Sequence, residues 1–442
     1  MLLGTAGAAH AQAESKNETG FETSFQRLGQ NLYDNGITFN SRYLGEFAAN
    51  PVGGQEQGTA FAGELNFNTA INMEKLVGLP GGYFHIQFVD RMGQNLTGQS
   101  INNSVQVQQI YGSGQTYQLS VLTYQQRLFD NKVDIYAGRT DIANDFIISP
   151  LYCYFQSNNI CGHPSNYQKD TQISSNPAAV WGGRILIAPT QHVYFKAGLY
   201  QTDPSLNPYI SHGFNFSVAN SGFSVPFELG YVGSADNALV PNHYDVGVIF
   251  NRSSFSAAYY NPESPTQYGR TLVYLEAQQR LFQQAPDSRR GIYGFAAALI
   301  GASGEKQQSN YQAVLGGVWQ GPFASRPHDN FAVMVTDTHY NPDYLNNLFR
   351  MRRAEGGTEF PHSNLVMGEV NYTVFINKWL NFTPNIQYII NPDGLGSSPY
   401  PKHNLPNVFV IGLQFNLSLS GLVGLPVADP APDRFLEYSR GE

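Results

Sequence analysis

Polar and charged side chains recur at every second position along short apolar stretches, and they are the residues of this chain that could do chemistry. They carry guanidinium, carboxylate or amide groups: Arg42, Glu64, Asn66, Arg91, Arg184, Glu276, Asn371, Asn385 and Gln387. Guanidinium groups donate hydrogen bonds in a planar fork, carboxylates accept them, and amides do both. An anion channel would need rows of Lys and Arg, and a hydrophobic channel an apolar lining, so this mixture predicts a wet lining that offers weak hydrogen bonds.

The stretch Gly368 to Gly394 indicates how such side chains are positioned. Two runs with alternating apolar and polar residues flank the dipeptide Asn377-Lys378, which we expect to reverse the chain. Successive side chains of a β-strand point to opposite faces, so each run has one apolar and one polar face. The polar faces carry Asn371, Asn385 and Gln387, and the apolar faces carry residues such as Val370 and Ile386.

Sixteen strand-like runs of this kind follow one another between Ile37 and Leu419, and no apolar run reaches the length of a helical membrane span. The connections alternate between long ones, at 48–60, 92–116 and 142–178, and short ones, at 73–81, 129–131 and 189–192. This asymmetry predicts an all-β fold: a transmembrane antiparallel β-barrel of about 16 strands, with long extracellular loops and short periplasmic turns. We expect one short helix among the turns, at Met73 to Gly78.

Composition narrows the class of protein. Of 442 residues, 13% are aromatic and only 13% charged, which disfavours both a disordered chain and a charge-coated soluble enzyme. The net charge of −8 argues against a nucleic-acid partner. We expect four segments: the remnant of a secretory signal peptide at 1–13, a periplasmic segment at 14–35, the barrel at 36–419 and a C-terminal tail at 420–442. The signal peptide rests on small residues that end in possible cleavage sites after Ala11 or Ala13.

Cys153 and Cys161 lie in the long connection 142–178. An even number of cysteines fits an oxidising compartment, and we predict a disulfide that holds the shape of this loop. Together with His163 the spacing matches no zinc motif, so neither a metal nor a cofactor is expected. The loop either folds into the pore or forms a surface lid.

Four stretches resemble the carbohydrate-selective outer-membrane porin family (OprB-type): GELNFNTAINMEKLVGLPGG, QRLFDNKVDIYAGRTDIANDF, LYCYFQSNNICG and the hairpin at 368–394. The resemblance covers roughly 35–419 and implies a constricted, water-filled pore that passes glucose and related sugars. It implies small-molecule sugars and outer-membrane lipid as partners, and leaves a monomer or a homotrimer open. One departure is visible: the last strand is followed by a Pro-rich tail, where many outer-membrane barrels end on an aromatic residue.

Given this resemblance, we expect part of the constriction to be formed by Arg42, Arg91 and Arg184, opposed by Glu64 and Glu276. Their guanidinium groups would hydrogen-bond sugar hydroxyls. The alternative is that these charges pair across adjacent strands and stiffen the wall. Arg139 has the parity of the outward-facing residues, so we expect a bulge to re-aim it or the strand to lift it above the membrane band.

Two alternatives of other classes stay open: a barrel for another small solute, and a secreted β-rich protein that binds or hydrolyses polysaccharide. Hydrolysis would need two carboxylates that flank a cleft, and Asp141 and Asp145 are no more than neighbours in sequence. The chain contains no Gly-x-Ser-x-Gly and no His-Glu-x-x-His motif. We therefore expect no enzymatic activity.

Overall fold

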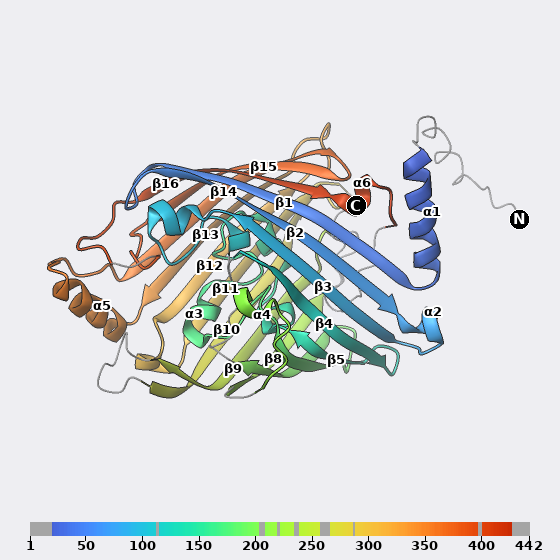
Figure 1. The fold of residues 1–442 in the computed structure, drawn as a ribbon, viewed down its shortest axis with the longest axis horizontal. Coiled ribbons are helices and arrows are strands. Elements are labelled where there is room, and N and C mark those ends of the chain that lie inside the picture. The colour runs from blue at the N-terminus through green and yellow to red at the C-terminus, as the bar shows by residue number, and fades with distance from the viewer. Residues whose placement is uncertain are drawn as a thin grey trace, which may run out of the picture.

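The alternating runs form one closed antiparallel β-barrel (Figure 1). The computed structural model describes residues 20–111, 115–202, 208–218, 222–233, 238–256, 266–285, 288–396 and 400–426. The strands are β1 Ile37–Val52, β2 Gly58–Asn72, β3 Gly82–Gly93, β4 Tyr117–Leu128, β5 Val133–Thr140, β6 Val180–Ile187, β7 Val193–Thr202, β8 Gly222–Gly233, β9 Asn242–Ser256, β10 Thr266–Gln283, β11 Gly291–Gly301, β12 Ser309–Gln320, β13 Asn330–Tyr340, β14 Asn364–Asn377, β15 Leu380–Ile390 and β16 Val408–Ser418. Each strand pairs with its neighbours in sequence, and β1 closes the ring against β16. The predicted sixteen-stranded barrel is confirmed.

The two faces of the strands differ as the sequence predicts. In β15 the side chain of Gln387 points inward and is 1% exposed, whereas its neighbour Tyr388 points outward and is 45% exposed. The turn into β15 is fixed by the side chain of Asn377, whose Oδ1 accepts hydrogen bonds from the backbone N–H of Trp379 (3.0 Å) and Leu380 (2.9 Å). Such Asx turns reverse a chain without help from other segments.

The helices lie in the connections and at the chain ends: α1 Gly20–Asp34, α2 Met73–Val77, α3 Asn166–Thr171, α4 Pro208–Ser211, α5 Pro342–Ala354 and α6 Leu419–Leu422. Helices α1, α2 and α6 lie at one end of the barrel and α5 at the other (Figure 1). The predicted helix at 73–78 is confirmed, since Asn72 caps its N-terminus and Gly78, with a φ of 74°, ends it. Within the described ranges, no helix is long and apolar enough to cross a membrane.

Two expectations about the connections are wrong. The first connection is not long, because β1 and β2 extend well beyond the expected strands and leave only residues 53–57 between them. The connection between β13 and β14 contains α5, a helix that the strand reading missed. Its start carries an ordinary helix signal: Asn341 accepts a hydrogen bond from the N–H of Asp343 (2.8 Å), and Pro342 occupies the first turn.

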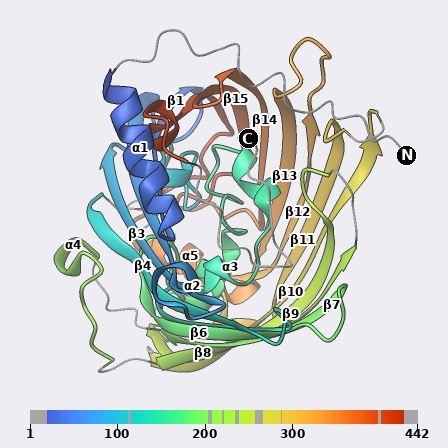
Figure 2. The same cartoon turned by 90° about the vertical axis from the view of Figure 1, so that its right-hand side faces the viewer.

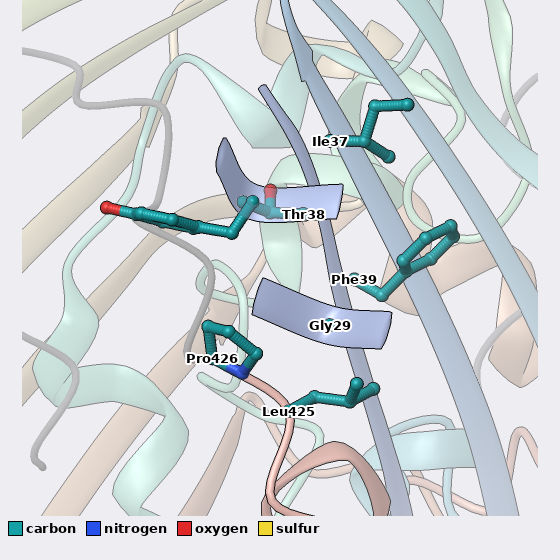
Figure 3. Close-up of a pocket in the computed structure, with 7 residues that line it drawn as sticks. Gly29, Ile37, Thr38, Phe39, Leu425 and Pro426 are labelled. Atoms are coloured by element: carbon teal, nitrogen blue, oxygen red, sulfur yellow. The ribbon is translucent and has the colours of Figure 1, made fainter. Parts of the chain in front are cut away.

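The two ends of the described chain meet at the end of the barrel that carries α1, α2 and α6 (Figure 1). Gly29 of α1 packs so closely on Leu425 and Pro426 that a Cβ there would lie 2.5 Å from the Leu425 side chain. Tyr33 and Ile37 line the same small cleft (Figure 3). Its volume of about 10 Å³ has room for one water molecule at most, so it is a packing defect and not a route for a solute. The expected signal-peptide remnant at 1–13, and most of the tail at 420–442, lie outside the described residues.

Candidate functional site

The connection between β5 and β6 fills part of the barrel interior. Ile142, Phe146, Leu151, Phe155 and Ile160 are each at most 1% exposed. Helix α3 of this connection lies inside the ring of strands (Figure 2). Of the two alternatives for the loop, the structure therefore shows the one in which it folds into the barrel.

Interactions within the β5–β6 loop itself stabilise its conformation. Ser149 caps the short 3-10 helix η4 (Pro150–Tyr154) by accepting a hydrogen bond from the N–H of Leu151 (3.2 Å). Cys153 and Cys161 form a disulfide, as predicted. The disulfide closes a turn within the loop and does not cross-link the loop to a strand.

We expect the double substitution Cys153→Ser, Cys161→Ser to loosen the loop and leave the barrel intact. A disulfide across so short a segment contributes roughly 2–3 kcal/mol, which acts only on the loop. Trypsin should then cleave after the partly buried Lys169 of this loop at least tenfold faster, while the folded barrel keeps its faster migration in unheated gels. Unchanged cleavage at Lys169 would contradict a role of the disulfide in holding the loop.

Backbone N–H groups of the loop bind a carboxylate of the far wall. Glu369 of β14 accepts hydrogen bonds from the N–H of Gln156 (2.9 Å) and of Ser157 (2.8 Å), and it is 1% exposed. Asn371 donates to the carbonyl oxygen of Tyr154 (2.9 Å), and Asn385 of β15 donates to the side chain of Gln156 (2.7 Å). The polar face of the β14–β15 hairpin therefore holds the loop.

Glu276 of β10 also binds the loop, since Tyr152 donates its phenolic proton to Oε1 of Glu276 (2.6 Å). Next to this pair, Ser149 donates to the side chain of Gln278 (2.7 Å). Glu276 thus contacts a loop hydroxyl, and in the described contacts it faces none of the three arginines that we expected opposite it.

Arg184 of β6 lies between two buried carboxylates. Its Nε lies 3.0 Å from Asp145 of the loop, and its Nη1 lies 3.1 Å from Asp134 of β5. Lys196 donates to the carbonyl oxygen of Asp145 (2.5 Å), and Tyr200 donates to its carboxylate (2.8 Å). Paired charges are the condition under which buried ions are tolerated, so this group joins the loop to the β5–β7 wall.

A second group of charges lies on β1–β3, where adjacent strands bring it together. Arg91 donates to Glu64 through Nε (2.8 Å), and Nη2 of Arg42 lies 3.8 Å from the other oxygen of Glu64. Glu64 is buried, whereas the side chain of Arg42 is 42% exposed. On the same wall Asn66 accepts hydrogen bonds from Asn68 (2.6 Å) and Gln87 (3.3 Å).

The structure thus separates the five residues of the expected constriction into distinct groups. Arg42, Glu64 and Arg91 form one group on β1–β3, while Arg184 and Glu276 each bind the β5–β6 loop. Of these five, only Arg42 keeps a large part of its charged side chain accessible to solvent. Contact of any of them with sugar stays a prediction.

A second connection, between β3 and β4, also folds inward, and the sequence reading missed it. Gln387 donates to the carbonyl oxygen of Val107 (3.0 Å), and Gln108 donates to the carbonyl oxygen of Glu46 (3.0 Å). Val107 and Ile101 of this connection are fully buried. The signal was available in the sequence, because regularly recurring apolar residues in a long loop need a surface to cover them.

Burial perturbs the ionisable groups of the β5–β6 loop. Burial and then repulsion by Asp145 raise the pKa of Asp141 to about 7. Burial also raises the pKa of Asp170 to about 6, although hydrogen bonds from Ser309 oppose the shift. His163 is displaced the other way, because burial lowers its pKa to about 4.

We expect the loop to loosen as the pH rises through about 7. When the loop is bound inside the barrel, here called the seated state, the pKa of Asp141 is higher than its ordinary value of 3.8. The seated state therefore binds the proton of Asp141 more tightly than the released loop does. This proton stabilises the seated loop fully below the ordinary pKa of Asp141, and the stabilisation is lost as the pH rises through the raised pKa. The ratio of seated to released loop then falls by at most about tenfold per pH unit. Trypsin cleavage after Lys169, normalised to the exposed Arg353, should increase from pH 6 to pH 8, and Asp141→Asn should flatten this increase. A profile that the substitution leaves unchanged would exclude Asp141 as the cause.

Comparisons with known proteins identify the family. A family model described as "Carbohydrate-selective porin, OprB family" matches residues 56–419. Porin B of Pseudomonas aeruginosa is 26% identical over 422 residues, which cover 89% of this chain and 91% of that protein. A high-pH structure of Pseudomonas putida OprB has a TM-score of 0.79 at 23% identity, over 88% of this chain and 96% of that one. A low-pH structure of the same protein has a TM-score of 0.55 at 18% identity, over 88% and 95%.

The structural likeness confirms the sixteen-stranded porin fold, and the family match covers most of the barrel. The apolar outer face of the barrel therefore faces an outer membrane, with the connections at the α2 end of the barrel in the periplasm and those at the α5 end outside the cell. The chain belongs to the OprB family of carbohydrate-selective porins, and it is an outer-membrane sugar channel.

Proposed function

We propose that this porin passes glucose and related small sugars by passive diffusion along the inner face of β1–β4. The observation that carries the proposal is Arg42, whose charged side chain faces the barrel interior and is 42% exposed. Arg42 forms an ion pair with the buried Glu64, and Glu64 forms a second ion pair with Arg91. An exposed guanidinium fork in a fixed position can donate to sugar hydroxyls without burying them, which keeps binding weak enough for conduction.

Further hydrogen-bonding groups extend this face toward the periplasmic ends of the strands. Thr38 and Asn40 share the inward parity of Arg42 on β1, and both are partly exposed. His85 of β3 is also partly exposed and contacts Gln125 of β4 through Nε2 (3.0 Å). A row of neutral donors and acceptors suits a neutral solute rich in hydroxyl groups.

The remaining predicted residues take two roles in this proposal. Asn66 and Arg91 stand beside Arg42 on the conducting face. Arg184, Glu276, Asn371, Asn385 and Gln387 act indirectly, because each binds an inward-folded loop and so sets how much of the interior the loops occupy.

We expect Arg42→Ala to reduce the entry of glucose relative to a neutral amino acid of similar size. The loss should be roughly threefold, since one net hydrogen bond contributes about 0.7 kcal/mol. Liposome swelling measures both rates, and Arg353→Ala, which alters an exposed arginine of α5, is the matched control. Equal entry of glucose and the amino acid through the unmodified barrel would contradict sugar selectivity, and an unchanged ratio in the Arg42 variant would remove Arg42 from the path.

The same assay addresses the finer points of the proposal. Sugars recovered from the liposomes should be chemically unchanged, because we infer that the chain conducts and does not convert its substrate. All residues of the proposed path come from one chain, so a monomer or a homotrimer would conduct alike per barrel. We also propose the segment boundaries given above, with 36–419 as the conducting unit, in contact with lipid, 14–35 on the periplasmic side, and 420–442 as a C-terminal tail.

A further inference from the structure

The connection between β7 and β8 does not extend away from the barrel. Its segment 208–218, here called the strap, contains α4, which lies outside the ring of strands (Figure 2). The strap reaches β4, where the aromatic rings of His212 and Tyr117 stack with centroids 4.1 Å apart. It therefore covers the outer face of the barrel near the extracellular ends of β4–β7.

Four consecutive strands bind the backbone of the strap. On β4, the N–H of Leu119 donates to the carbonyl oxygen of His212 (3.0 Å), and on β5, Nη2 of Arg139 donates to that of Gly213 (3.4 Å). On β6, Nε1 of Trp181 donates to the carbonyl oxygen of Phe216 (2.9 Å), and on β7, Nε2 of Gln201 donates to that of Ser217 (3.0 Å). These carbonyl groups therefore need no water. A non-helical backbone at membrane depth meets the same requirement, because hydrocarbon offers no hydrogen bonds.

Arg139 explains why the strap is held so closely. It lies opposite the outward-facing Leu122 and Trp181 in the sheet, so its parity is outward, as the sequence indicates. Of the two explanations that we expected, the re-aiming bulge is absent, because the register of β5 with β4 and β6 is unbroken. Arg139 is nevertheless only 1% exposed. Its guanidinium group lies 5.4 Å from the ring of Phe216 and also donates to the carbonyl oxygen of Ala179 (2.5 Å). The strap thus separates the guanidinium group of Arg139 from the medium around the outer face of the barrel.

Among the strap residues whose exposure the structure describes, five side chains are exposed; four of them are apolar and the fifth is Ser217. Ile210 is 79% exposed, Phe214 51%, Phe216 44% and Val218 65%. The strap contains no Lys, Arg, Asp or Glu. A water-exposed loop usually has the opposite arrangement, with polar side chains outward, and a cluster of this kind marks an interaction surface.

The exposed apolar side chains continue the lipid-facing surface of the strands beneath. Leu199 of β7 is 59% exposed, Trp181 39% and Leu122 37%, all on the outward face. We propose that the strap lies in the outer leaflet of the membrane, where Ile210, Phe214, Phe216 and Val218 contact lipid acyl chains. The strap would then extend the hydrophobic surface of the barrel and shield Arg139 from hydrocarbon.

Nitroxide labels on single introduced cysteines test this proposal, since the two native cysteines are disulfide-bonded. Phe214→Cys and Val218→Cys would be labelled and reconstituted in phosphatidylcholine vesicles, with Leu199→Cys as lipid-facing reference and Asn346→Cys, exposed on α5, as aqueous reference. Power saturation measures collisions with oxygen, which partitions into lipid, and with a polar nickel chelate, which stays in water. We expect the ratio of oxygen to nickel accessibility at 214 and 218 to match that at 199 and to exceed that at 346 severalfold.

Each other outcome overturns the proposal. A ratio like that at 346 would place the strap in water. Low accessibility to both reagents, with spin–spin broadening that grows with the protein-to-lipid ratio, would mean that a second copy of the chain covers it. Low accessibility without broadening would mean that the same chain covers it. Arg139→Ala, in a barrel whose folding is verified by gel migration, should lower the ratio at 214 because one attachment is lost, and it should leave the ratio at 199 unchanged.

Discussion

Replacing Glu369 with alanine is expected to release the β5–β6 loop from the wall and to abolish discrimination by solute size. The carboxylate of Glu369 accepts two backbone N–H groups of the loop, at 2.9 and 2.8 Å, in a buried position. Removing this acceptor leaves two buried N–H groups without their partner, which costs about 1–3 kcal/mol each. Roughly 3 kcal/mol or more is therefore lost, a factor of over one hundred in the population of the loop bound to the wall. Liposome swelling should then show entry of a trisaccharide at a rate close to that of glucose.

The control for this substitution is Glu74→Ala, which removes an exposed carboxylate from α2 in a periplasmic turn. It should leave both rates unchanged. Trypsin cleavage after Lys169 gives an independent reading, because it should increase in the Glu369 variant and not in the control. A Glu369 variant that still excludes the trisaccharide and resists cleavage would show that the loop is held without this carboxylate.

Replacing Arg184 with methionine should reduce the stability of the barrel itself. The substitution keeps much of the side-chain volume but leaves Asp134 and Asp145 without the guanidinium group that lies 3.1 and 3.0 Å from them. Removing one partner from a buried charge pair costs about 3–5 kcal/mol. We expect the temperature at which the barrel loses its fast gel migration to fall markedly.

Two further variants make this result specific. Arg252→Met changes an exposed arginine of β9 and should leave the transition temperature unaltered. Arg184→Gln combined with Asp134→Asn and Asp145→Asn removes the charges together and should recover part of the lost stability. If the Arg184 variant melts like the unmodified protein, Lys196 and Tyr200 alone are sufficient to compensate Asp145.

The strands were predictable because each depends on a local pattern with a period of two residues. The hairpin at 368–394 shows this best, since Gln387 and Tyr388 lie on the faces that their parity predicts. The disulfide was predictable because Cys153 and Cys161 lie close together in one loop. In each case the information lies within a few neighbouring residues.

The arrangement of the site was not predictable, because it depends on contacts between distant parts of the chain. Parity shows that Glu276 and Arg184 face inward, but it does not show that Tyr152 and Asp145 of an inserted loop bind them. The outward parity of Arg139 was read correctly, yet no pattern in β5 reveals that residues 208–218 cover it. Helix α5 differs, because its start is marked locally: the sequence Asn-Pro-Asp at 341–343 supplies the capping residue and the proline of the first turn.

The attachment of the β5–β6 loop to β14 has a consequence for the order of assembly. Gln156 and its acceptor Glu369 are separated by 213 residues, and eight of the sixteen strands, β6 to β13, lie between them in sequence. Contacts over such distances form late, because the intervening chain must first be ordered. The β5–β6 loop cannot form its hydrogen bonds to Glu369 until β14 has joined the sheet. Selectivity should therefore be among the last properties that a newly made barrel acquires.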